Sequence, residues 1–213
     1  MKNFIKSSIL IICIFITLIL LVGCGKKTQS KENETNSSET NLTKETETQI
    51  DWKSNTKGVQ AAEIILKLEA NMSFNDAENI LSSNSATKDD KYIRGQYKFP
   101  DGSKITVRND EDTSALNIDI SFPEEIQELA DENVNLSNYK NINAFGTYID
   151  YVNGFGTNGV LASKYHLSSG DYIYNYYWIK DRNNYAHANF YKSTGKMLSA
   201  QLIINGKQQN WND

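Results

Sequence analysis

The chain has 213 residues, with 22 Lys and Arg against 26 Asp and Glu, and a formal net charge of −4. Such a mildly acidic protein has no electrostatic reason to bind nucleic acid or anionic lipid headgroups. It contains only two histidines, so a three-histidine zinc site cannot be built.

The N-terminus has the layout of a secretory signal, with a cationic start at residues 1–6 and an apolar run over residues 9–21. The sequence Leu21-Val22-Gly23-Cys24 that ends this run resembles the bacterial lipobox. That resemblance implies removal of residues 1–23 and acylation of Cys24 by fatty acids such as palmitate. A transmembrane anchor is the alternative, but the run is short for a span of roughly 20 residues.

The lipobox resemblance also implies a location, the extracytoplasmic face of a bacterial cell membrane, with the lipid bilayer contacted through the acylated Cys24. Cys13 lies in the segment to be removed, and it is the only other cysteine. No thiol then remains for a disulfide, a cysteine-bound metal or a cysteine nucleophile.

Residues 24–56 are dominated by Lys, Glu, Ser, Thr and Asn and contain few apolar side chains. Such a segment cannot bury enough apolar surface to offset its chain entropy. We therefore predict a disordered tether that holds the folded part away from the membrane, with Trp52 as a candidate for the start of order.

From residue 57 onward the chain has the pattern of two copies of one unit, repeat 1 over residues 57–133 and repeat 2 over residues 134–213. Each copy opens with a helical stretch, residues 59–71 in the first and residues 136–142 in the second. The spacing between matching positions grows along the chain, which loop insertions explain.

A second helix is predicted to begin in each copy with the same capping pattern. Ser73 is followed three residues later by Asp76, and Thr147 is followed by Asp150. A hydroxyl at the N-cap with a carboxylate three positions on satisfies backbone N–H groups of the first helical turn.

Strands follow the helices in both copies. Tyr97 and Phe99 correspond to Tyr176 and Trp178, and rings two residues apart lie on one face of a strand. The last strand of each copy alternates apolar and polar positions; its apolar residues are Leu116, Ile118, Ile120 and Phe122 in repeat 1, and Leu198, Ala200, Leu202 and Ile204 in repeat 2. The predicted fold class is α+β, as two tandem helix-helix plus antiparallel-sheet repeats, each with its helices packed on one sheet face.

This tandem unit resembles the beta-lactamase inhibitor protein (BLIP) family, on the strength of Tyr176-x-Trp178, Ala186-x-Ala188-x-Phe190 and Gly195-Lys196 followed by a hydrophobic strand. The resemblance covers about residues 58–205. It implies a concave sheet surface that binds a protein partner without catalysis. This chain departs from the family in two ways. The inhibitor's domains carry disulfides, whereas this chain is predicted to have none. The inhibitor's target-binding loops also cannot be matched, residue by residue, to the nearest candidate here, the acidic loop at residues 109–112. The resemblance therefore does not carry beta-lactamase inhibition over to this chain.

The outward-facing strand positions differ between the copies. Those of repeat 1 are charged and polar, whereas those of repeat 2 include several rings and isoleucines. Apolar patches with polar rims are typical of partner-binding surfaces. The predicted partner-binding residues are Tyr177, Ile179, Tyr185, His187 and Tyr191. The alternative is that these side chains pack on repeat 1 or on the C-terminal tail around Trp211.

Other motifs indicate no further site. Residues 154–159 match G-x-G-x-x-G by letter, but a dinucleotide-binding loop needs a strand before it and a helix after it. These glycines are predicted to end a helix. The acidic pairs lack the alternating ligands of a calcium loop, and His187 has no catalytic partner at a readable spacing. We therefore predict no catalytic residues, no cofactor and no metal.

The sequence thus predicts a membrane-anchored surface lipoprotein that is not an enzyme and binds an envelope or secreted protein through the outer sheet face of repeat 2. Two alternatives stay open. One is a lipoprotein that binds a small ligand or a cell-wall fragment, which requires a pocket with convergent polar groups. The other is an envelope assembly or spacer protein.

Overall fold

A computed structural model describes residues 50–89, 95–109, 115–120, 128–143 and 145–210. They belong to one compact unit that spans Thr48–Asp213. The predicted signal, the lipidation site Cys24, most of the predicted tether and Trp211 lie outside the described residues.

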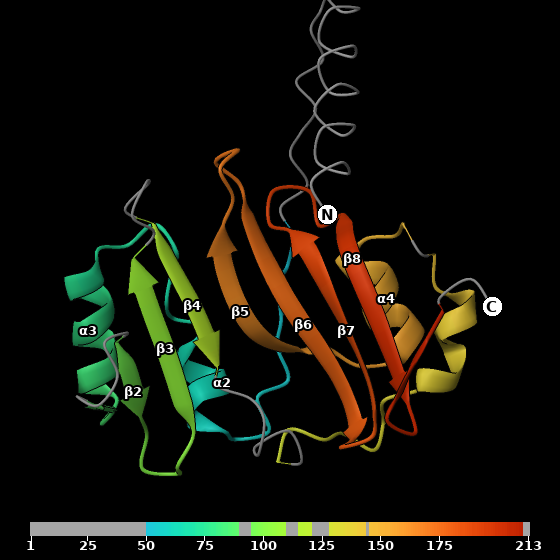
Figure 1. The fold of residues 1–213 in the computed structure, drawn as a ribbon, viewed down its shortest axis with the longest axis horizontal. Helices are drawn as coiled ribbons and strands as arrows, with labels where there is room; N and C mark the ends of the chain where they lie inside the picture. Colours follow the sequence, from blue (N-terminus) through green and yellow to red (C-terminus); the bar gives the residue numbers. More distant parts are fainter. Residues whose placement is uncertain (1–49, 90–94, 110–114, 121–127, 144, 211–213) are drawn as a thin grey trace, which may run out of the picture. The chain divides into compact units, whose positions relative to one another are not determined.

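The core of the unit is a single nine-stranded antiparallel sheet in which every strand pairs with the next one along the chain (Figure 1). The strands are β1 Thr87–Lys88, β2 Gln96–Lys98, β3 Lys104–Asn109, β4 Leu116–Ile120, β5 Val160–His166, β6 Tyr172–Asp181, β7 Asn184–Tyr191, β8 Met197–Ile204 and β9 Lys207–Gln209.

The prediction of two tandem helix-helix plus sheet repeats is wrong. The last strand of the predicted first repeat, β4, pairs with β5 through Ile118↔Lys164 and Asp119↔Ser163. This ladder joins the strands of the two predicted repeats into one sheet. The described helices are also shorter than predicted: the first helix of the first predicted pair has only five residues, and that of the second pair is a six-residue 3₁₀ helix.

These helices are α2 Gln60–Ile64, α3 Phe74–Ser83, the 3₁₀ helix η2 Leu136–Asn141 and α4 Tyr148–Phe155. Both predicted caps are present. The Asp76 N–H donates to Ser73 Oγ at 3.1 Å, and the Thr147 N–H donates to Asp150 Oδ2 at 2.7 Å. A hydroxyl and a carboxylate three residues apart were therefore sufficient to locate both helix starts.

The helix predicted over residues 59–71 is shortened to α2 because other parts of the fold bind the backbone that follows it. The Leu116 N–H donates to the Ala70 carbonyl at 2.8 Å, and Lys164 Nζ donates to the Leu68 carbonyl at 2.6 Å. Because these carbonyls accept hydrogen bonds from residues of β4 and β5, they do not accept the backbone hydrogen bonds that would continue the helix.

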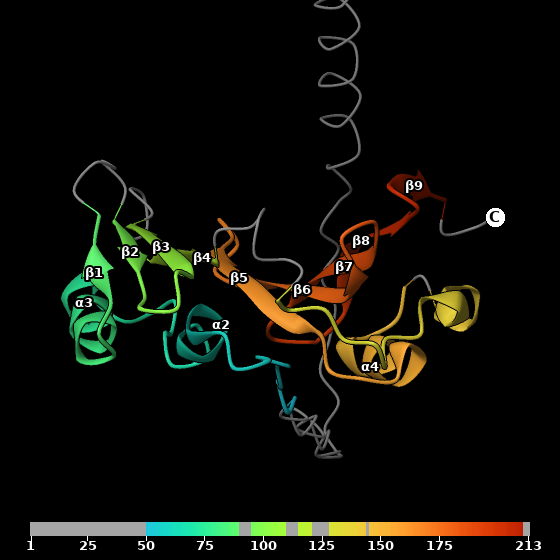
Figure 2. The same ribbon diagram turned by 90° about the horizontal axis from the view of Figure 1, so that it is seen from below.

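The helices α2, α3 and α4 lie on one side of the sheet, as Figure 2 shows. The strand residues on that side form the hydrophobic core with them. The two ring pairs predicted to share a face, Tyr97 with Phe99 and Tyr176 with Trp178, are all buried here. The other side, which we call the outer face, carries the alternate strand positions.

The strand β5 was not predicted because its pattern does not alternate. Its pairing with β6 shifts register between Leu161 and Ser163, which is a β-bulge. Beyond the bulge, Lys164 points to the core side and is only 2% exposed. Its ammonium group lies 5.3 Å from the centre of the Tyr174 ring and 3.9 Å from Glu69 Oε1.

Residues 50–56, assigned to the tether by the sequence, are packed into the unit. The Trp52 ring lies among Tyr148, Tyr174 and Tyr176, at centroid distances of 4.8, 5.0 and 5.9 Å. The backbone is bound as well, since the Asn55 N–H donates to the Gly159 carbonyl at 2.9 Å.

Asp131 holds the C-terminal end of residues 50–56 in place. Its carboxylate accepts a hydrogen bond from Asn55 Nδ2 at 2.6 Å and from Asn133 Nδ2 at 2.9 Å, and lies 3.3 Å from Lys57 Nζ. Burial alone would raise the pKa of Asp131, but the Asn133 hydrogen bonds and the Lys57 charge hold it below its usual value. A carboxylate with these partners stays ionised and holds the segment in place.

Candidate functional site

The outer face of β6 and β7 carries a cluster of three rings that were predicted to bind a partner. Tyr177 and His187 are directly paired across the two strands, and their rings stack at a centroid distance of 5.0 Å with 17° between planes. Tyr185 joins the stack at 6.1 Å from Tyr177. We call Tyr177, Tyr185 and His187 the ring cluster.

The ring cluster is half-buried and held in place. Burial first, and the neighbouring Tyr185 second, raise the pKa of Tyr177 above its usual value. His187 Nε2 lies 2.6 Å from Gln201 Oε1 on β8, and because an amide oxygen only accepts, this ring nitrogen donates the hydrogen bond. Nδ1 is shielded from solvent and makes no hydrogen bond to the described residues.

A row of polar side chains crosses the sheet beside the ring cluster. Asn189 Oδ1 accepts from Asn175 Nδ2 at 2.8 Å and from the Tyr165 hydroxyl at 3.3 Å, and Asn189 Nδ2 donates to Ser199 Oγ at 2.8 Å. The row links β5, β6, β7 and β8 and orients its members before any partner arrives.

The other two predicted residues are placed differently. Tyr191 is on the same face and half-buried, but it pairs with Ile173, on the far side of the Asn175–Asn189 row from the ring cluster. Ile179 is only 1% exposed, so its side chain does not reach a partner in this structure. Strand alternation assigned the face of Ile179 and could not show that its neighbours cover it.

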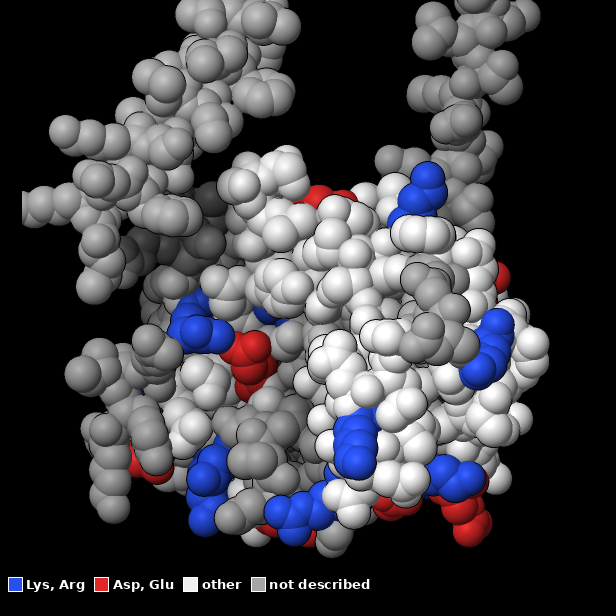
Figure 3. Space-filling model, turned by 45° about the vertical axis from the view of Figure 1, so that its right-hand side comes forward, with Lys and Arg blue, Asp and Glu red and all other residues white. Residues whose placement is uncertain are grey.

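The outer face of β2 to β4 has a different character. Arg108 and Asp119 form an ion pair there, and Lys98 is paired with Lys104 across β2 and β3. This charged half contrasts with the surface over β7 and β8, which Figure 3 shows as largely uncharged among the described residues. The difference between the two halves, read from the sequence, is therefore present on the folded surface.

An open groove of about 510 Å³ lies between η2 and the strand ends of β6, β7 and β8. Leu136, Tyr139 and Ile204 give it an apolar lining, and Lys180, Asp181 and Asn184 stand at its polar side. Asn184 Nδ2 donates to both carboxylate oxygens of Asp181, at 2.9 and 2.8 Å. No sequence pattern predicts this groove, because its lining comes from four separate elements.

The glycines at residues 154–159 end a helix, as predicted. Gly156 is the C-cap of α4 with φ of 79°, and its N–H donates to the Val152 carbonyl at 2.9 Å. Gly154 leaves room for Ile142, since a Cβ at this glycine would lie 2.2 Å from Ile142 Cγ1. These are packing roles.

Within the described ranges, no cluster of three or more His, Cys, Asp or Glu side chains could hold a metal ion. None of the described helices is long and apolar enough to cross a membrane.

In comparisons with known proteins, no family model matches the chain, and no curated protein is significantly similar to it. Membership of the BLIP family therefore stays a prediction that depends on the short motifs quoted above.

Proposed function

We propose that this chain is a lipid-anchored protein on the extracytoplasmic face of a bacterial membrane, where it binds an envelope or secreted protein without catalysing a reaction. The ring cluster on the outer face carries this proposal. It belongs to a sheet side on which none of α2, α3 and α4 lies (Figure 2). Rings already stacked lose little further freedom when a partner covers them.

We expect the triple variant Tyr177→Ser, Tyr185→Ser, Tyr191→Ser to bind its partner at least about tenfold more weakly, because rings at the centre of an interface contribute most of its energy. The partner is identified first by photocrosslinking in intact cells, with the reactive group at Tyr185. Affinity is then measured on the full chain.

The matched control places the photoreactive group at Lys98, on the outer face of β2, where no crosslink to the same partner is expected. Circular dichroism of the triple variant checks that the sheet is intact. Unchanged partner binding by a folded triple variant would show that the ring cluster is not the binding surface.

The groove beside η2 favours a second candidate, the binding of a cell-wall fragment. Its volume lies within the range of small-molecule sites, and its apolar lining stands next to the exposed Lys180 ammonium group. A peptidoglycan muropeptide offers matching chemistry, with carboxylates and methyl groups on one small molecule.

For this candidate, titration calorimetry with a disaccharide-tripeptide fragment is expected to give a binding isotherm for the full chain. Lys180→Gln is expected to weaken the binding about tenfold through loss of a charge-assisted contact, whereas Arg182→Gln, in the adjacent turn, should leave it unchanged. An absence of heat at millimolar fragment would exclude this role for the groove.

A further inference from the structure

Three large apolar side chains are exposed at one corner of the unit. Among the described residues only four large hydrophobic side chains are more than a third exposed, and three of them are Phe145 at 87%, Ile149 at 45% and Leu198 at 44%. We call these three residues the apolar corner. Isolated exposed apolar residues are ordinary, but a group of them at one place indicates a contact surface.

The backbone joins the two segments that carry these residues. Thr147 and Lys196 form an antiparallel bridge, flanked by hydrogen bonds from the Met197 N–H to Gly146 and from the Tyr148 N–H to Gly195. Phe145 lies two residues before Thr147 and Leu198 two residues after Lys196, so both lie close to this bridge in the chain.

The exposure of the other two residues has a local cause. Asn189 pairs with Ser199 and Phe190 with Met197, so Leu198 is the extra residue of a bulge in β8. In α4, Tyr148 and Tyr151 point into the core, which turns Ile149 outward.

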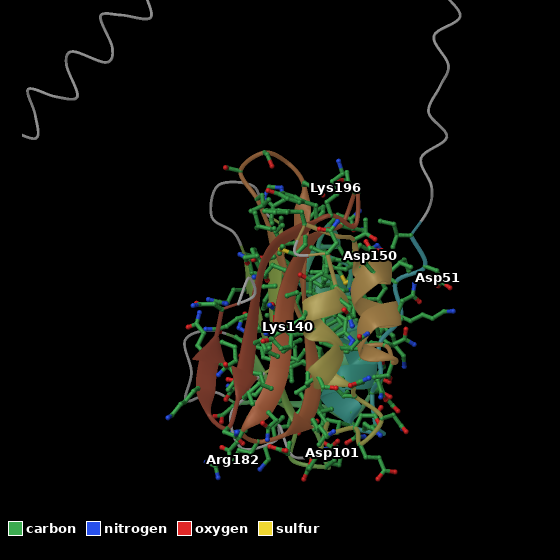
Figure 4. All side chains as sticks on the ribbon, turned by 90° about the vertical axis from the view of Figure 1, so that its right-hand side faces the viewer. Asp51, Asp101, Lys140, Asp150, Arg182 and Lys196 are labelled. Atoms are coloured by element: carbon green, nitrogen blue, oxygen red, sulfur yellow. The ribbon has the colours of Figure 1, made fainter. Side chains whose placement is uncertain are left out.

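The tether enters the folded unit at this same corner. A Cβ on Gly195 would lie 2.7 Å from Ile50 Cδ1, so the first described residue packs against the turn that leads into β8. Figure 4 shows Asp51 at the same end of the sheet as Asp150 and Lys196, with Asp101 and Arg182 at the opposite end.

We propose that the apolar corner inserts into the bilayer that carries the acylated Cys24, so that the protein sits on the membrane in a fixed orientation. This inference depends on the lipid anchor of the proposed function. Ile50 stands 26 positions after Cys24 in the sequence, and a random coil of that length has an end-to-end distance of roughly 28 Å. A surface contact made within that reach is intramolecular, so a weak apolar contact is sufficient.

The charges around the corner indicate apolar insertion rather than attraction to anionic lipid. Asp51 pairs with Lys53 at 2.8 Å, and the positive Lys196 stands across from the helix end that carries Asp150. Because these charges balance, the contact should be equally strong on zwitterionic and anionic vesicles and insensitive to salt.

The test uses the full acylated chain, isolated with its lipid and reconstituted into phosphatidylcholine vesicles. A spin label is attached at Phe145→Cys, and the matched control carries it at Leu66→Cys, the fourth exposed hydrophobic side chain. We expect the label at position 145 to collide with dissolved oxygen several-fold more, and with a water-soluble nickel chelate several-fold less, than the label at position 66.

Equal nickel accessibility at the two positions would overturn the insertion. Immobilisation of the label at position 145 only when envelope proteins are added would also overturn it, and would assign the corner to a protein partner. Mass spectrometry of the reconstituted chain reports acylation of Cys24 independently, so an absent anchor is distinguished from an anchored protein that does not insert.

Discussion

Trp52→Ala is expected to lower the free energy of unfolding by about 2 to 4 kcal/mol, somewhat less than removal of a fully buried aromatic side chain, because Trp52 is half-buried against the core. Its ring contacts those of Tyr148, Tyr174 and Tyr176. Neighbouring bonds would loosen with it, including the one from the Tyr148 hydroxyl to the Lys53 carbonyl at 2.7 Å. A change of this size is a large fraction of the stability of a typical domain.

Urea denaturation followed by circular dichroism measures this change on the full chain. Phe145→Ala is the matched control, because that ring is 87% exposed and its removal should change stability by less than about 0.5 kcal/mol. If the two variants were equally stable, residues 50–56 would be an appendage and not part of the folded unit.

The second large effect concerns Lys164 and pH. Burial lowers the pKa of Lys164 to about 8, whereas an unfolded lysine titrates near 10.4. Between these values the unfolded state binds more protons than the folded state, so the free energy of unfolding rises as the pH is raised. The free energy of unfolding is expected to rise by roughly 1 to 2 kcal/mol between about pH 7 and pH 9. Over the whole range between the folded and unfolded pKa values of Lys164 the rise would reach about 3 kcal/mol.

The tyrosines limit this window from above. Burial raises the pKa of Tyr148 to about 12, so stability falls once unfolded tyrosines ionise above about pH 10. Urea titrations between about pH 7 and pH 9 therefore isolate the lysine. The rise should disappear in Lys164→Met and persist in Lys98→Met, which changes an exposed lysine on β2. If the free energy of unfolding of Lys164→Met still rose between these pH values, the rise would come from another titratable group.

Local signals in the sequence located several elements of the fold but not its architecture. The Ser73 and Thr147 caps marked two helix starts, and strict alternation in β4 identified its buried face. The stacked pair Tyr177 and His187 was assigned to the outer face by the same alternation. Each of these features depends on residues within a few positions of one another, which is the range over which sequence patterns are informative.

Features that depend on distant partners were missed. The pairing of β4 with β5 joins residues far apart in the chain. The bulge at Leu161 and the buried Lys164 interrupt the apolar–polar alternation of β5, so its sequence does not have the pattern typical of a strand. Trp52 stands in a polar stretch whose composition indicates disorder, yet its partners lie about a hundred residues away. The burial of Ile179 likewise depends on neighbours that alternation does not reveal.

The position of residues 50–56 has a mechanical consequence if the chain is anchored at Cys24 as proposed. The Leu161 N–H donates to Ser54 Oγ at 2.9 Å, and the Trp52 ring packs on β6 residues. A pull between the proposed anchor and a partner seated on Tyr177 and His187 would therefore have a direct route through β5 and β6, beside the routes through Tyr148 and Asp131. The two residue pairs that join β4 to β5 lie beside this direct route, so force can pass from the segment to the ring cluster without loading that short ladder.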